Sequence, residues 1–197
     1  MNRDVAFFNV DTQQPSEDRT RLVFRTRVEP IAEGIAKLLR HAVSHDIFVV
    51  STACVNAGPV HRALHPETMF VSMDASPASW TPSLLGARAL FLEKRTCGGP
   101  EANTRERAYD VFHSNPNAGR VIRALDIPRW VVFGDSAGYC VRSTVEGLLA
   151  LGCEVSIVAD VVGKGIDSDE ASAEVLRALE RQGASLDCLD DVLAERQ

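Results

Sequence analysis

The sequence predicts an α/β protein of three layers (α/β/α), in which helices cover both faces of a parallel, Rossmann-like doubly wound sheet. Short apolar runs alternate along the chain with segments whose apolar residues recur at helical spacing. The runs are apolar throughout rather than at every second position, which is typical of parallel strands buried on both faces. At 197 residues the chain can bury one sizeable core, so we expect a single domain over residues 1–197.

The individual elements follow from these patterns in chain order. Strands are predicted at residues 5–10, 46–51, 89–92, 130–133 and 154–158, each bounded by Gly, Pro or charged residues. Helices are predicted over residues 31–43, 115–125, 138–151 and 168–182. Asn115 followed by Pro116 indicates an N-cap with a first-turn proline, and Gly152 indicates a C-cap. Residues 52–86 have weak periodicity and residues 96–107 are polar and Gly-rich, so both read as loops.

Composition excludes several classes of function. The formal charge of -6 argues against a nucleic-acid partner, because phosphate binding needs clustered Lys and Arg. No apolar stretch approaches the ~18 residues that span a bilayer, and the N-terminus does not resemble a signal peptide. We therefore expect no membrane association and a cytoplasmic location. Five cysteines without C-x-x-C spacing suggest free thiols rather than disulfides or a structural zinc site.

Three reactive residue types fall where predicted strands end. Cys140 lies in the first turn of the helix after the fourth strand, and the positive end of a helix favours thiolate and lowers a cysteine pKa. Asp11 follows the first strand and can accept a thiol proton. Lys94 follows the third strand and can stabilise both charges. A structural cysteine, a turn aspartate and an exposed strand-end lysine are the competing explanations. In a doubly wound sheet, ligands bind beyond these strand ends.

The same residues carry a resemblance to a known family. Residues 7–13, the pair Glu93 and Lys94, and residues 134–141 with 152–160 resemble the isochorismatase-like cysteine hydrolases, which include nicotinamidases and N-carbamoylsarcosine amidase. The resemblance covers most of the chain, and the last block is the most specific. It implies a sheet of six parallel strands, a catalytic triad of Cys140, Asp11 and Lys94, and a covalent acyl-enzyme.

The resemblance has further implications for the site and the assembly. It implies a non-proline cis peptide just before Ser136, and an oxyanion hole formed by the backbone amides of Ser136 and Cys140. Asp11 would take the thiol proton and pass it to the departing nitrogen. The resemblance also implies a homodimer or larger homo-oligomer acting on a small-molecule substrate.

Two departures from the family pattern concern metal and substrate. Nicotinamidases bind a metal through an Asp-x-His arrangement after the second strand, and residues 51–61 lack it. His61 and His65 have i, i+4 spacing, but flanking prolines crowd them, so we expect no metal and no cofactor. Residues 97–108 read as an insertion by the pocket. There Arg105 and Arg107 either meet a carboxylated substrate or belong to a solvated loop.

We expect the pocket walls to come from aromatic side chains: Phe8, Tyr109, Phe112 and Tyr139, with core packing as the alternative for Phe8. The predicted activity is cleavage of a C–N bond in a small amide or carbamoyl compound. One alternative is vinyl ether hydrolysis as in isochorismatase, where the aspartate does the work. A second is a non-catalytic scaffold in which the three residues do not converge. A third is a redox sensor, which requires Cys54 close to Cys140.

Overall fold

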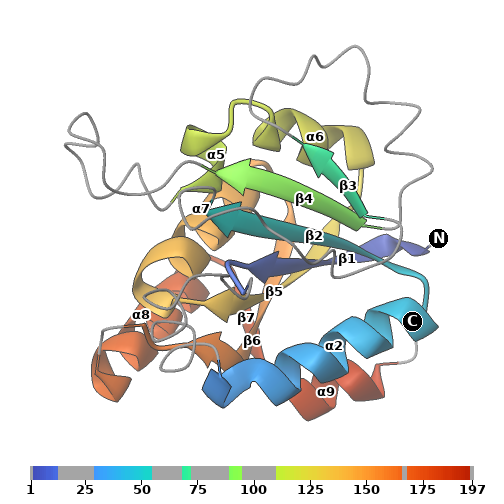
Figure 1. Cartoon of the computed structure of the whole chain (residues 1–197). Helices are drawn as coiled ribbons and strands as arrows, with labels where there is room; N and C mark the ends of the chain where they lie inside the picture. The colour runs from blue at the N-terminus through green and yellow to red at the C-terminus, as the bar shows by residue number, and fades with distance from the viewer. Residues whose placement is uncertain are drawn as a thin grey trace, which may run out of the picture.

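The computed structural model describes residues 2–12, 29–54, 68–71, 89–94, 110–165 and 168–195. Within these ranges the strands form one sheet of seven, in the order β3-β4-β2-β1-β5-β6-β7, and every neighbouring pair is parallel (Figure 1). The strands are β1 (Asn2–Val10), β2 (Ile47–Cys54), β3 (Thr68–Val71), β4 (Ala89–Lys94), β5 (Arg129–Asp135), β6 (Glu154–Gly163) and β7 (Ser185–Asp187).

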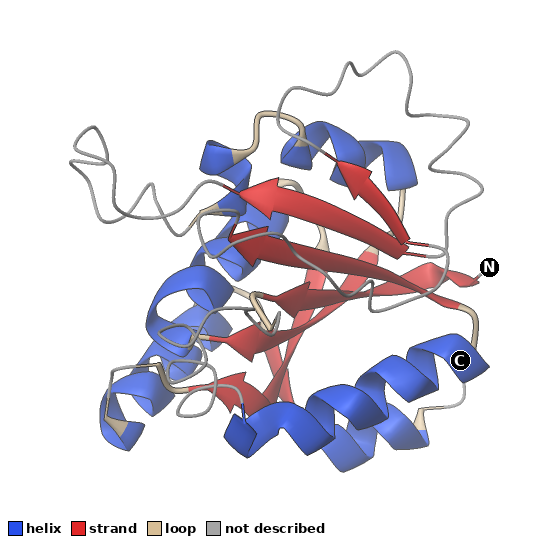
Figure 2. Ribbon diagram, in the orientation of Figure 1, coloured by secondary structure: helices blue, strands red, loops and turns tan. Residues whose placement is uncertain are grey.

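Helices cover both faces of this sheet (Figure 2). One face packs against α2 (Ala32–Ser44), which the short turn η1 (Glu29–Ile31) precedes, and α9 (Leu189–Ala194). The other packs against α5 (Val111–Ser114), α6 (Ala118–Leu125), the turn η4 (Ala137–Val141), α7 (Arg142–Ala150) and α8 (Asp169–Arg181). Each face has its own apolar core, so the molecule has three layers. None of the described helices is long and apolar enough to cross a membrane.

The predicted architecture is confirmed. Each of the predicted strands is present, and most extend a few residues beyond the apolar run that predicted them. The resemblance implied six strands, and the described sheet has seven because both edges carry a short strand. The sequence analysis did not identify β3 and β7, which have only four and three residues. Strands this short depend on pairing with a longer neighbour rather than on their own pattern.

The order of the strands defines where a ligand can bind. From β1 in the middle, the chain first builds β2, β3 and β4 on one side and then β5, β6 and β7 on the other. The direction of winding therefore reverses between β1 and β5, and ligands of open α/β sheets bind beyond the carboxyl ends at such a point. Gly134 brings the two strands close there. It has φ +124°, and a Cβ at this position would lie 2.2 Å from the Val10 carbonyl oxygen.

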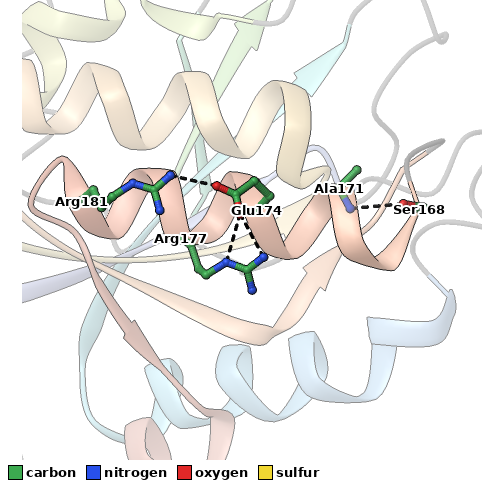
Figure 3. A network of polar contacts seen from close by, with 5 residues as sticks. All are labelled: Ser168, Ala171, Glu174, Arg177 and Arg181. Carbon is green, nitrogen blue, oxygen red and sulfur yellow. Dashed lines mark hydrogen bonds and ion pairs between the residues drawn. The ribbon is translucent and has the colours of Figure 1, made fainter.

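The charged residues of α8 lie on the solvent-exposed side of the helix. Ser168 caps it by accepting a hydrogen bond from the Ala171 amide at 3.2 Å, and Glu174 binds Arg177 and Arg181 at 3.0 and 2.9 Å (Figure 3). The two guanidinium groups hold the pKa of Glu174 below its ordinary value. The opposite side of α8 buries Leu179 in the core. We therefore interpret the charged network as a solvated helix face.

Close packing between α5 and α7 gives a first testable prediction. A Cβ added at Gly147 of α7 would lie 2.1 Å from the Phe112 ring, so the ring occupies the space that a side chain would need. Because well-packed contacts tolerate little added volume, Gly147→Ala should lower the free energy of unfolding by about 1–3 kcal/mol in urea denaturation. Gly119→Ala is the matched control. Its nearest neighbour would be 3.7 Å away, so it should leave stability unchanged or raise it by up to about 1 kcal/mol. Equal losses in both variants would contradict this packing.

Candidate active site

The three residues predicted to react lie together at the carboxyl edge of the sheet. Asp11 directly follows β1, Lys94 is the last residue of β4, and Cys140 lies in η4 after β5. The Lys94 ammonium forms an ion pair with Asp11 Oδ2, and both side chains lie near enough to the Cys140 thiol to shift its pKa. The exposed fractions of the Lys94 and Asp11 side chains are only 1% and 12%. The sheet thus brings a thiol, a carboxylate and an ammonium to one place.

The thiol is protonated in this arrangement. Burial raises the pKa of Cys140 well above its ordinary value, and the negative charge of Asp11 raises it further, while Lys94 acts in the opposite direction. The prediction that the helix N-terminus lowers the pKa of Cys140 is therefore wrong. The physical reason is that Cys140 is only 8% exposed and that the charge of Asp11 opposes the effect of Lys94. Cys140 therefore keeps its proton, and the Asp11 carboxylate beside it can accept that proton.

Asp11 is held from both its backbone and its side chain. It has φ +50°, a left-handed conformation that few residues other than glycine adopt. Its amide donates to Thr52 Oγ1 at 3.1 Å, and Thr52 Oγ1 donates to Asp11 Oδ1 at 2.8 Å. The following Thr12 donates to the buried Asn9 at 2.7 Å, and Asn9 in turn donates to Ser51 on β2. These bonds fix the turn that carries the carboxylate.

Thr52 is a residue that the sequence analysis did not single out. It lies near the end of β2, between the strands that carry Asp11 and Lys94, and it is 1% exposed. The sequence offered one sign of a role at the site, which is a hydroxyl residue at the end of an apolar strand. Such residues are also common where a strand simply passes into a loop, so this sign does not distinguish a site residue.

The turn that carries Cys140 contains the cis peptide that the resemblance implied. The peptide bond between Asp135 and Ser136 is cis. The Ser136 carbonyl accepts the amides of Tyr139 and Val141 at 3.2 and 3.1 Å, and the second of these is a π-type bond that spans Cys140. The turn after β6 closes on the same place, because a Cβ at Gly165 would lie 2.6 Å from Ser136 Oγ. The amides of Ser136 and Cys140 therefore belong to one tightly packed turn.

The end of β4, which carries Lys94, is fixed by Asn115. Its Nδ2 donates to the Glu93 carbonyl at 2.7 Å, and its Oδ1 accepts the Asn117 amide at 3.0 Å. The prediction that Asn115 is the N-cap of a helix beginning at Pro116 was wrong by two residues, because α6 begins at Ala118. The buried Asn115 side chain instead joins this turn to the strand next to the site.

The aromatic residues predicted to line the pocket have different positions. Phe8 is completely buried and its ring lies 5.8 Å from that of Trp130, so it belongs to the core, and its assignment to the pocket is corrected. Phe112 packs on Gly147 and lines a groove of 540 Å³ between α5, α6 and α7 that Asp11, Lys94 and Cys140 do not line. Its predicted place in the substrate pocket stays a prediction. Tyr139 is half-buried in the turn of Cys140, and Tyr109 lies outside the described residues.

Other predictions fall on parts of the chain that are not described. These are His61 and His65, the side chain of Cys54, and residues 97–108 with Arg105 and Arg107. Within the described ranges, no group of three or more His, Cys, Asp and Glu side chains is placed to hold a metal ion.

Solved structures show that this is the fold of the isochorismatase-like hydrolases, as the motifs indicated. A cysteine hydrolase from Pseudomonas syringae pv. phaseolicola matches with a TM-score of 0.65 and 15% identity, over 98% of this chain and 92% of its own. The nicotinamidase SaPncA from Staphylococcus aureus matches with 0.65 and 14%, over 94% of this chain and 99% of its own.

The same fold also carries other activities. A ribonuclease from Caenorhabditis elegans matches with a TM-score of 0.60 and 17% identity, over 97% of this chain and 80% of its own. No family model and no curated protein matches the sequence. The structural likeness therefore establishes the fold, and the chemistry has to be argued from the site.

Proposed function

We propose that this chain is a cysteine hydrolase that cleaves the C–N bond of a small amide or carbamoyl compound. The observation that carries the proposal is that the buried Asp11–Lys94 ion pair lies beside the Cys140 thiol, where both charges shift the pKa of the thiol. A thiol beside a carboxylate has a base ready for its proton. A buried ammonium beside them balances the negative charge that moves between sulfur and carboxylate.

The first half of the reaction forms a thioester. Cys140 Sγ attacks the carbonyl carbon while Asp11 takes the thiol proton, so no free thiolate has to form in the buried site. The carbonyl oxygen becomes an oxyanion, which the amides of Ser136 and Cys140 would stabilise. When the intermediate collapses, the C–N bond breaks, and Asp11 gives its proton to the departing nitrogen. The acyl group remains on Cys140.

The second half releases the acid. A water molecule attacks the thioester carbon, and Asp11 now takes a proton from the water. The oxyanion is stabilised by the same two amides. When the C–S bond breaks, the proton on Asp11 returns to the sulfur and the acid leaves. Lys94 keeps its charge throughout and stabilises whichever partner is negative.

The placement of the residues also bears on the alternatives. A non-catalytic scaffold predicts that Asp11, Lys94 and Cys140 do not converge, and they do. A vinyl ether hydrolase would use Asp11 and would not need Cys140.

The cytoplasmic location stays a prediction. The homodimer or larger homo-oligomer also stays a prediction, and light scattering on the purified chain can test it.

The test is to trap the acyl-enzyme. The protein is incubated with nicotinamide, pyrazinamide and a set of N-carbamoyl amino acids, and acid-quenched samples are analysed by intact and peptide mass. We expect an acyl adduct on Cys140, and we expect Cys140→Ala to lower kcat/KM by about 10⁴-fold or more. Cys188→Ala is the control, because Cys188 is an exposed free thiol on α9's cap and should leave turnover unchanged. Turnover that survives in Cys140→Ala would point to the aspartate-driven alternative.

A further inference from the structure

We infer that Thr52 is a positioning residue for Asp11 in the proposed hydrolysis, so this inference rests on the proposed function. Thr52 touches Asp11 twice, through the backbone amide and through the carboxylate. Its side chain is 1% exposed, and β2 lies directly between β1 and β4. The hydroxyl therefore stands between the strand that carries the carboxylate and the strand that carries the ammonium.

The hydrogen bonds of this hydroxyl have a defined direction. The amide of Asp11 can only donate, so Thr52 Oγ1 accepts that bond at 3.1 Å. The single proton of the hydroxyl is then available for Asp11 Oδ1, at 2.8 Å. Lys94 binds the other oxygen, Oδ2. With each oxygen held by a different strand, the carboxylate cannot rotate without breaking a buried hydrogen bond or an ion pair.

This arrangement also affects the thiol. Burial raises the pKa of Cys140, and the negative charge of Asp11 raises it further. A hydroxyl that donates to Oδ1 takes up part of that charge. Without the Thr52 hydroxyl, more of the charge acts on the sulfur, and the pKa of Cys140 rises further. Thr52 thus fixes the orientation of the carboxylate and moderates its effect on the thiol.

The experiment compares Thr52→Val, which keeps the shape, with Thr52→Ser, which keeps the hydroxyl. We expect Thr52→Val to lower kcat/KM by about 10²-fold, because the acceptor is misplaced. The pH profile of Cys140 alkylation by iodoacetamide should move to higher pH. Thr52→Ser should keep most of the rate and the alkylation profile. Ser156→Ala, which removes a buried strand hydroxyl from β6, should change neither the rate nor the profile.

The outcomes separate this inference from the proposed function. If the wild type turns over an amide and Thr52→Val has the same rate and the same alkylation profile, the inference is wrong and the proposed function stands. If the wild type hydrolyses nothing in the panel, the proposed function fails. The alkylation profile of Cys140 then tests the role of Thr52 by itself, and an unchanged profile in Thr52→Val would show that Thr52 does not act on the thiol through Asp11. Should Thr52→Val fail to fold by circular dichroism, Thr52→Ala takes its place in the same comparison.

Discussion

Asp11→Asn is expected to gain cysteine reactivity while it loses hydrolysis. The carboxylate raises the pKa of Cys140 and Lys94 lowers it. Replacing the carboxylate by a neutral amide removes the first effect and keeps the second, so thiolate forms at lower pH and alkylation at neutral pH becomes faster. Hydrolysis falls by about 10²–10⁴-fold, because an amide cannot take the thiol proton or return it to the leaving nitrogen. A merely structural role for Asp11 would not move the two activities in opposite directions.

The measurement is limited alkylation with iodoacetamide from about pH 5 to about pH 9, followed by peptide mass mapping. The chain offers a matched control at another cysteine. Cys188 Sγ donates to Asp191 at 2.9 Å, and this bond raises the pKa of Cys188. Asp191→Asn should therefore change the profile of Cys188 and leave that of Cys140 alone. Slower alkylation of Cys140 in Asp11→Asn than in the wild type would refute the proposed charge coupling.

Lys94→Met is expected to cost both stability and activity. Lys94 is 1% exposed and pairs with Asp11, so the variant leaves a largely buried carboxylate without its counter-charge. Breaking a buried pair by removing one partner typically destabilises by about 3–5 kcal/mol, which urea denaturation resolves. The pKa of Cys140 should rise further, since Lys94 is the charge that lowers it. Its alkylation profile should accordingly move to higher pH, the opposite direction from Asp11→Asn.

Two further variants make the Lys94 prediction specific. The double variant Asp11→Asn, Lys94→Met should recover part of the lost stability, because neither charge is then left alone. Lys164→Met breaks an ion pair with Asp169 in which both side chains are more than half exposed, and it should change stability by less than about 1 kcal/mol. A Lys94→Met protein as stable as the wild type would mean that the pair contributes nothing to the fold.

The strands were predictable because their signal is local. The runs at residues 5–10 and 130–133 are apolar throughout, and in the structure they lie side by side in the middle of the sheet, buried on both faces. The short edge strands β3 and β7 carry no such signal, since their pairing comes from β4 and β6. The start of α6 was misplaced for a similar reason: Asn115 binds Glu93, which is distant in the sequence.

The sequence by itself determined the class of fold and that Asp11, Lys94 and Cys140 lie at one edge of the sheet, because parallel strands bring whatever follows their carboxyl ends to that edge. Only the tertiary structure decided the state of the site. The direction of the pKa shift of Cys140 depends on the burial of the thiol and on the charges of Asp11 and Lys94, which are distant from Cys140 in the sequence. The contact of Thr52 with Asp11, the core position of Phe8 and the packing of Phe112 on Gly147 likewise depend on strand order and side-chain packing, which no local pattern encodes.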